Sequence, residues 1–291
     1  MSGHDEVPPE PSDGPEISEG WRTEEIPTAE ARRLAEGASV PLGLTPLRLP
    51  EFDADDDLAT EALDTASRGV ELPSRYEVHE SLGREDHGDL FRVYDHELER
   101  EVVLKLLRED APLHAGAQFR DDARTVAKVD HPGAVTVFDM GALEDGRPYV
   151  TRAPLEGRPL GRWAREVELK RVVRWITTAT DTIAAAQRVG IVHRRLEPEA
   201  IVVGRVVKVR GFGAGVAEPS MFMAPELVRG EPSGPAADVF SIGAILDEVL
   251  GDRIPMSLAD IVNRATDPIA SRRHPTAQAL LADLEDWLDL G

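Results

Sequence analysis

The sequence changes character at Pro73, and this change limits what the chain can fold into more than any other feature. Residues 1–72 hold 18 Asp and Glu against five Arg, a net charge of −13. They also contain eight prolines, namely Pro8, Pro9, Pro11, Pro15, Pro27, Pro41, Pro46 and Pro50. Such a segment buries too little apolar surface to offset the entropy of ordering it. We therefore predict a mostly disordered acidic tail over 1–72 and a folded domain over 73–291.

Two stretches of the tail carry more than solvating charge. Thr28–Glu36 has a composition that favours a helix, and Val40–Phe52 places apolar residues among its prolines. The tail is then either a solvated linker or a segment that docks on a protein partner.

Composition excludes several classes of protein. The net charge of −21 disfavours binding to nucleic acid or to an anionic membrane surface. No apolar run approaches the roughly 18 residues of a membrane helix, and Met1–Glu6 lacks the basic start of a secretory signal. The absence of cysteine is typical of a reducing compartment, and the eight histidines are scattered. We expect a cytoplasmic protein that binds no nucleic acid, no membrane and no metal.

The apolar pattern of the domain predicts an α+β fold. Alternation predicts a small sheet with one helix near its middle, and i, i+3/i+4 spacing predicts mainly helices after it. The expected strands are 76–82, 89–94, 101–107, 134–139 and 148–151, and the expected helices include 117–129 and those around 172–184 and 239–249. The sheet should occupy about 73–153 and the helical part about 154–291.

Six short motifs follow one another in this domain, and their order is more informative than any one of them. They are Leu82–Gly88, Val102–Lys105, His193–Ala200, Gly211–Gly213, Met223–Glu226 and Asp238–Gly243. In this order they resemble the signature motifs of the protein kinase family, most of all its bacterial serine/threonine members, over about residues 75–291. The resemblance implies a two-lobed fold with a nucleotide site between the lobes. An unrelated mixed domain would have to imitate all six motifs in sequence.

The resemblance assigns the phosphate-binding end of that site. Lys105 matches the family's phosphate-contacting lysine, and Asp122 matches its glutamate partner, which is one methylene longer. Asp122 either pairs with Lys105 or lies on a solvated helix face. Gly83 and Gly88 remain from the family's three loop glycines, while Glu85 stands at the position of the middle glycine and Asp86 follows it. We expect these two carboxylates to repel a triphosphate.

Other matched positions have lost the family's catalytic chemistry. Arg195 stands at the aspartate that accepts the substrate hydroxyl, and Glu197 stands at a lysine. Ala200 and Gly211 stand at the asparagine and the aspartate that ligate magnesium, an ion that prefers carboxylate oxygen. The resemblance therefore implies that no catalytic set is intact and that no metal is bound.

The resemblance also bears on the adenine pocket and on the peptide platform. Val103 replaces a smaller alanine, and Arg152 falls near the gatekeeper position, so the pocket is either closed or altered but tolerant of nucleotide. Residues 214–223 are short for an activation segment, and 250–258 leave no room for the family's docking helix.

The positions that keep the family's residues are structural. They are His193 and Phe212 in the core between the lobes, Asp238 as the anchor of the catalytic-loop backbone, and Glu226 with Arg273 as a buried ion pair, for which Arg272 is a rival partner.

These matches favour a catalytically inactive kinase-like module, a pseudokinase that acts through a protein partner such as an active kinase. We then expect no cofactor, with magnesium-ATP binding absent or weak. The alternative is an atypical ATP-dependent kinase or nucleotidyltransferase with unusual catalytic residues, including Lys105 and Glu199. A third possibility is an inert domain that carries a functional tail.

Overall fold

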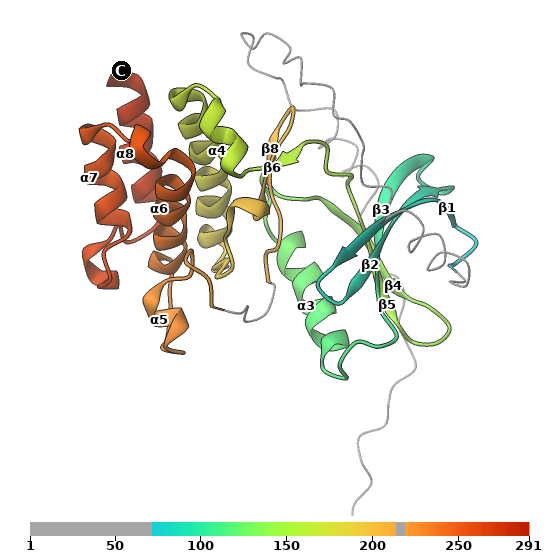
Figure 1. The fold of residues 1–291 in the computed structure, drawn as a ribbon. Helices are drawn as coiled ribbons and strands as arrows, with labels where there is room; N and C mark the ends of the chain where they lie inside the picture. The colour runs from blue at the N-terminus through green and yellow to red at the C-terminus, as the bar shows by residue number, and fades with distance from the viewer. Residues whose placement is uncertain (1–71, 214–218, 291) are drawn as a thin grey trace, which may run out of the picture. The chain divides into compact units, whose positions relative to one another are not determined.

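The computed structural model describes residues 72–213 and 219–290, and the predicted α+β, two-lobed architecture is confirmed there. A five-stranded sheet with one helix forms the first lobe, and helices form most of the second (Figure 1). The first lobe consists of β1 Tyr76–Glu85, β2 Gly88–Asp95, β3 Arg100–Leu107, α3 Ala115–Ala127, β4 Val137–Ala142 and β5 Pro148–Arg152.

The sheet is antiparallel throughout, with the strand order β1-β2-β3-β5-β4. Its apolar side chains divide between two clusters, one around Phe91 and Leu104 and one that joins Phe119 of α3 to Val150 of β5. Alternating side chains on a strand reach opposite faces, so α3 covers only one of them. β4 begins three residues later than predicted, because Ala134 instead bridges to Val209 in the second lobe.

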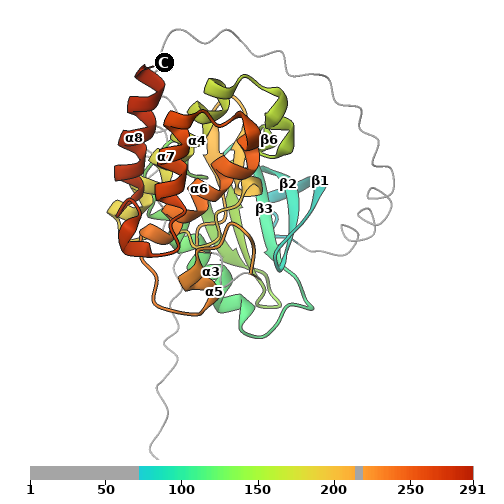
Figure 2. The same ribbon diagram turned by 60° about the vertical axis from the view of Figure 1, so that its left-hand side comes forward.

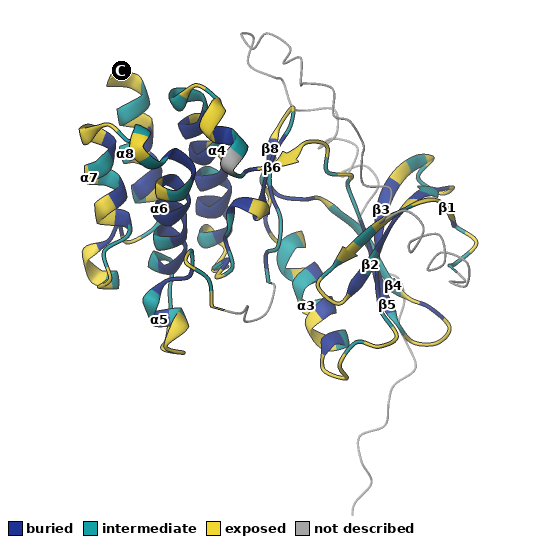
Figure 3. Cartoon of the chain, viewed as in Figure 1, coloured by how far each residue is buried: buried dark blue, intermediate teal, exposed yellow. Residues whose placement is uncertain are grey.

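The second lobe forms around two largely buried helices. α4 Leu169–Arg188 and α6 Ala236–Leu250 bury most of their apolar residues in one core cluster (Figure 3). α7 Met256–Ala265 and α8 Ala277–Leu290 pack beside them (Figure 2). The side chain of Glu168 caps α4 by accepting a hydrogen bond from the backbone N–H of Lys170 at 3.2 Å.

A second, three-stranded sheet belongs to the second lobe and lies on the side of its helices that faces the first lobe (Figure 1). It consists of β6 Arg158–Pro159, β7 Ile201–Val203 and β8 Val207–Val209, in that order. The chain segments just before β7 and just after β8 carry the second lobe's contribution to the site described below.

Several sequence predictions are limited by the part of the chain that is described. The tail segments within 1–71 and residues 214–218 lie outside it, so the predictions for them stay predictions. Between α6 and α7 the chain makes only one 3-10 turn, Gly251–Arg253, where the sequence left no room for a docking helix. Among the described residues no helix has the length and apolarity needed to cross a membrane.

Candidate functional site

The turn between β1 and β2 brings two carboxylates to the boundary between the lobes. Glu85 pairs in register with Gly88, so Asp86 and His87 form a two-residue hairpin turn. Asp86 has a φ of +52°, which an aspartate tolerates better than most residues do. A Cβ atom at Gly88 would lie 2.8 Å from two carbons of the Lys105 side chain, so glycine there leaves room for the lysine.

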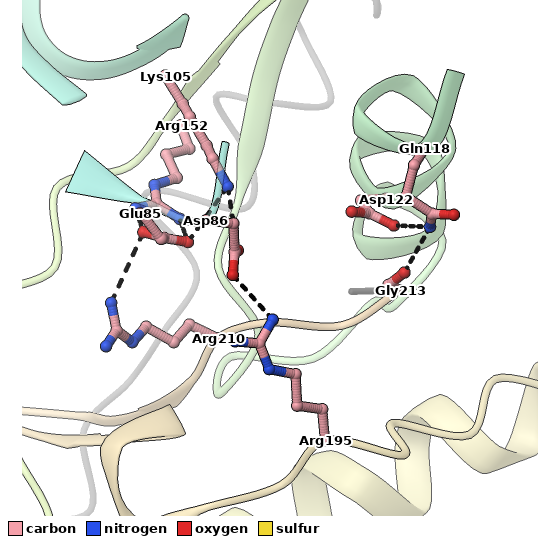
Figure 4. Close-up of polar contacts among 9 residues, drawn as sticks. All are labelled: Glu85, Asp86, Lys105, Gln118, Asp122, Arg152, Arg195, Arg210 and Gly213. Atoms are coloured by element: carbon pink, nitrogen blue, oxygen red, sulfur yellow. Dashed lines mark hydrogen bonds and ion pairs between the residues drawn. The ribbon is translucent and has the colours of Figure 1, made fainter. Parts of the chain in front are cut away.

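Lys105 extends from β3 towards this turn. Its Nζ lies 3.6 Å from a carboxylate oxygen of Glu85 and 3.5 Å from one of Asp86 (Figure 4). Within the described ranges, Lys105 makes no ion pair with Asp122 on α3. Of the two sequence interpretations of Asp122, the structure therefore does not support pairing with the lysine.

Asp122 is half-buried and takes part in a different contact. Gln118, one turn earlier on α3, donates from Nε2 to Asp122 at 2.6 Å and to the backbone carbonyl of Gly213 at 2.9 Å (Figure 4). Burial raises the pKa of Asp122 to about 6, against the opposing effects of the Gln118 hydrogen bond and the Lys105 charge. This carboxyl is thus neither fully solvated nor ion-paired.

Glu85 lies among three cations. Arg152 of β5 donates to both of its carboxylate oxygens, at 2.6 and 3.3 Å, and Arg210, just after β8, lies 3.6 Å away (Figure 4). Burial alone would raise the pKa of Glu85, but the charges of Arg152 and Lys105 lower it to about 2. The carboxylate is therefore ionised across the physiological range.

Asp86 is held from the second lobe. Arg195 donates from Nη1 to its carboxylate at 2.8 Å. Although burial opposes ionisation, the charges of Lys105 and Arg195 lower the pKa of Asp86 below its ordinary value. We expected Glu85 and Asp86 to make the site repel a triphosphate. The structure instead shows both carboxylates neutralised, with four cations arranged around two anions.

The segment that carries Arg195 is fixed by a buried carboxylate. Asp238 of α6 accepts hydrogen bonds from the backbone N–H groups of His193 and Arg194, at 3.0 and 2.9 Å. The His193 ring contacts the Phe212 ring at 4.8 Å between centroids and hydrogen-bonds the Arg210 carbonyl at 2.9 Å. Through Asp238 and His193, these contacts fix the backbone that precedes Arg195 and the backbone carbonyl of Arg210.

The positions expected to lack metal ligands lie close to this network. Ala200 is buried in the 3-10 turn Pro198–Ala200, Gly211 adopts a φ of +86°, and Glu197 is half-buried just before the turn. Neither Ala200 nor Gly211 offers a side-chain oxygen. No cluster of three His, Asp or Glu suited to a metal exists in the described part of the chain. The donor set at these positions does not fit magnesium.

A cavity of about 70 Å³ lies between the sheet, α3 and the Gly211–Phe212 segment. Its lining includes Lys105, Asp122 and Arg152, but not Val103, which is buried opposite Arg152 in the β3–β5 register. A cavity of this size accepts a few water molecules, since one needs roughly 10–15 Å³. The cavity as it stands does not enclose a whole nucleotide.

The structural positions of the second lobe lie apart from this cavity. Arg273 donates to both carboxylate oxygens of Glu226 at 2.8 Å, and the arginine side chain is fully buried while that of the glutamate is 8% exposed. Arg272, the rival partner, is exposed.

Sequence reasoning missed two residues of the site. Arg210 was not singled out, although it directly precedes the Gly211–Gly213 motif. Gln118 was missed as well, since an uncharged residue one helical turn before Asp122 gives no distinctive signal.

Comparisons with known proteins agree with this architecture. Residues 76–282 match the family model described as "Protein kinase domain". The serine/threonine-protein kinase pkn3 of Myxococcus xanthus is 28% identical over 244 residues, which cover 72% of this chain and 45% of that protein. PknB of Mycobacterium tuberculosis, also named a serine/threonine-protein kinase, is 29% identical over 245 residues, 74% of this chain and 39% of that protein. The chain spans less than half the length of these relatives.

A solved structure supports the fold alone. The crystal structure of the Mycobacterium tuberculosis PknI kinase domain superimposes with a TM-score of 0.62 at 18% identity, over 73% of this chain and 96% of that one.

These comparisons correct one prediction. From the altered positions Arg195, Ala200 and Gly211 we expected a chain that is not an enzyme. The matched relatives are named serine/threonine-protein kinases, and nothing in the described residues shows inactivity, so that expectation is wrong as it stands.

Proposed function

This chain belongs to the protein kinase family, and we propose that it is an atypical ATP-dependent phosphotransferase acting on serine or threonine hydroxyls. The observation that carries the proposal is the match of residues 76–282 to the protein kinase domain, together with the names of the matched relatives. The position of Lys105 at the inter-lobe cavity supports it. A protein partner, predicted from the sequence, is then the bearer of the hydroxyl.

The proposed reaction needs little covalent chemistry from the protein. The bond between the γ-phosphorus and the β,γ-bridging oxygen breaks, and its electron pair leaves with ADP. A new bond forms between that phosphorus and the substrate hydroxyl oxygen, and the hydroxyl proton passes to water. Catalysis of this transfer rests mainly on positioning and on stabilising the charge of the phosphoryl group.

The residues present are suited to the electrostatic part of this task. Lys105, Arg152 and Arg195 bring positive charge to one place, and guanidinium groups bind phosphate oxygens in a bidentate manner. Arg195 cannot accept a proton, so the hydroxyl is not activated by a base at that position. We therefore expect a slow enzyme compared with one that keeps the aspartate.

The expectation that magnesium-ATP binding is absent or weak stays a prediction. The proposed transfer requires ATP to bind, so the two conflict, and titration with ATP in magnesium and in EDTA decides between them.

The test is transfer of label from γ-labelled ATP to the purified protein and to a mixture of serine- and threonine-containing peptides. We expect labelling that Lys105→Ala abolishes and that the exposed-lysine control Lys128→Ala leaves intact. Transfer from α-labelled ATP in its place would make the chain a nucleotidyltransferase. No transfer from either label, with EDTA or with magnesium, would overturn the proposal.

A further inference from the structure

The charges around the β1–β2 turn are unequal in number. Glu85 and Asp86, here called the carboxylate turn, are contacted by four cations. These cations, here called the cation cluster, are Lys105, Arg152, Arg195 and Arg210. These two carboxylates neutralise only half of that charge, and Asp122, the third carboxyl at the cavity, pairs with none of the four cations in the part of the chain that the structure describes.

The cation cluster is formed by segments from both lobes. Lys105 and Arg152 extend from neighbouring strands of the sheet, and their side chains are only 15% and 13% exposed. Arg195 and Arg210 extend from the second lobe, on backbone fixed through Asp238 and His193. Cations held this far out of water need an anion among them, because an uncompensated charge there costs several kcal/mol.

The carboxylate turn is the part of this arrangement that can leave. Both of its carboxylates belong to one hairpin turn, so both move when that turn opens. Asp86 and its partner Arg195 are each more than one third exposed, so water reaches this pair already.

Two positions at this place, Ala200 and Gly211, provide no side-chain oxygen for a metal. The cation cluster can itself supply the counter-charge for a bound polyphosphate. Arginine suits this role, because its planar guanidinium matches the spacing of two phosphate oxygens.

We infer that the cation cluster is a metal-independent site for a linear polyphosphate, and that the carboxylate turn occupies this site as an internal anion until the ligand displaces it. The ligand class is the polyphosphate of a nucleotide or an inorganic polyphosphate. A triphosphate carries more negative charge than two carboxylates, so it balances the cluster better than the turn does.

This inference deepens the proposed function, and it rests on that function only for the choice of ATP as a ligand. Binding is measured without transfer, so the two fail separately. Binding without transfer of label would sink the phosphotransferase alone, whereas transfer that needs magnesium, with no binding in EDTA, would sink the inference alone.

The experiment is calorimetric titration of the full chain with inorganic triphosphate and with ATP, each in EDTA and in magnesium. We expect both ligands to bind in EDTA. If ATP binds more tightly than triphosphate, the nucleoside contributes and the site serves nucleotides; equal affinities mean that the polyphosphate alone is recognised. No binding of either ligand in EDTA would overturn the inference.

Two sets of variants test the displacement. In Glu85→Gln/Asp86→Asn the internal anion is removed, so we expect triphosphate to bind at least about tenfold more tightly, because the open state is more populated. The matched control is Glu144→Gln/Asp145→Asn, an exposed acidic pair on the β4–β5 turn. Equal affinities in the two double variants would contradict the role of the carboxylate turn.

Arg195→Gln tests the cluster itself. We expect triphosphate binding in EDTA to weaken by about tenfold, the loss of one charge-assisted contact. Its exposed neighbour Arg194→Gln is the control and should bind as the wild type does. Thermal melting of each variant establishes that it is folded, so unchanged binding in a folded Arg195→Gln protein counts against the inference.

Discussion

Two ion-paired groups in this molecule use the same chemistry and differ in balance. In the second lobe, Arg273 and Glu226 form a closed one-to-one pair with the arginine fully buried. Between the lobes, two carboxylates of one turn face four cations that are partly exposed. In the closed pair one positive charge meets one negative charge, which leaves none for a ligand. In the open cluster the cations outnumber the carboxylates that contact them, so positive charge remains for an anionic ligand. Charge balance and burial, rather than the residue types, separate a structural pair from a candidate binding site.

Breaking the closed pair should have the largest effect. Arg273→Ala leaves Glu226 buried and uncompensated, and we expect the free energy of unfolding to fall by about 3–5 kcal/mol. Arg272→Ala, next in sequence but exposed, is the control and should change it by less than about 0.5 kcal/mol. Chemical denaturation of both variants measures the difference. Equal, small losses would show that the buried pair does not stabilise this lobe.

Breaking the open cluster at Glu85 should cost less. We expect Glu85→Gln to lower the free energy of unfolding at pH 7 by about 1–2 kcal/mol, because the remaining cations still have Asp86 and water. The folded pKa of about 2 lies below the ordinary 4.5, so this stabilisation is present above pH 4.5 and is lost as the pH falls towards 2. The loss should shrink in high salt. A salt-independent loss as large as that of Arg273→Ala would mean that Glu85 is held as tightly as Glu226, and the cluster would then be no more open than the buried pair.

Asp86 offers a finer comparison within the cluster. Its contact with Arg195 is more than one third exposed on both sides, so Asp86→Asn should change stability by no more than roughly 0.2–1 kcal/mol. Asparagine also tolerates the positive φ at this position. Denaturation beside Glu85→Gln measures the ratio, and a larger loss at Asp86 than at Glu85 would mean that the second lobe, not Arg152, holds the turn.

The sequence predicted the fold well for a physical reason. Alternating and helical apolar spacing is local information, and it located every strand of the larger sheet and the two central helices. The start of β4 was misplaced because Ala134 pairs with Val209, 75 positions later in the numbering, which no local pattern encodes.

The site was only partly predictable. The order of the motifs located Lys105 and Asp122. It could not show whether the two form an ion pair, because that depends on which carboxylate the tertiary fold brings nearest to the lysine. Glu85 and Asp86 were interpreted as bare negative charges because sequence shows a residue's own charge and not the cations around it. Arg152 meets Glu85 across the folded sheet, and Arg195 meets Asp86 only where the two lobes come together, so neither ion pair is visible in the sequence.

Asp122 provides the smallest and most specific test, because it is the carboxylate of this site that the cation cluster does not pair. Its folded pKa of about 6 lies above the ordinary 3.8, so the folded protein holds this proton more tightly than the unfolded chain does. Ionising Asp122 therefore costs stability, a cost absent below about pH 4 and complete above about pH 6. We expect Asp122→Asn to melt at a higher temperature than the wild type at pH 7.5, with the difference shrinking at pH 5 and vanishing near pH 4.

The control is Asp121→Asn, an exposed neighbour on the same helix, which should show no such pH dependence. Thermal melts at the three pH values measure the gap. A variant less stable than the wild type at pH 7.5 would show that Asp122 is paired with a cation after all, and the contrast between a paired and an unpaired carboxylate on the two sides of Lys105 would be lost.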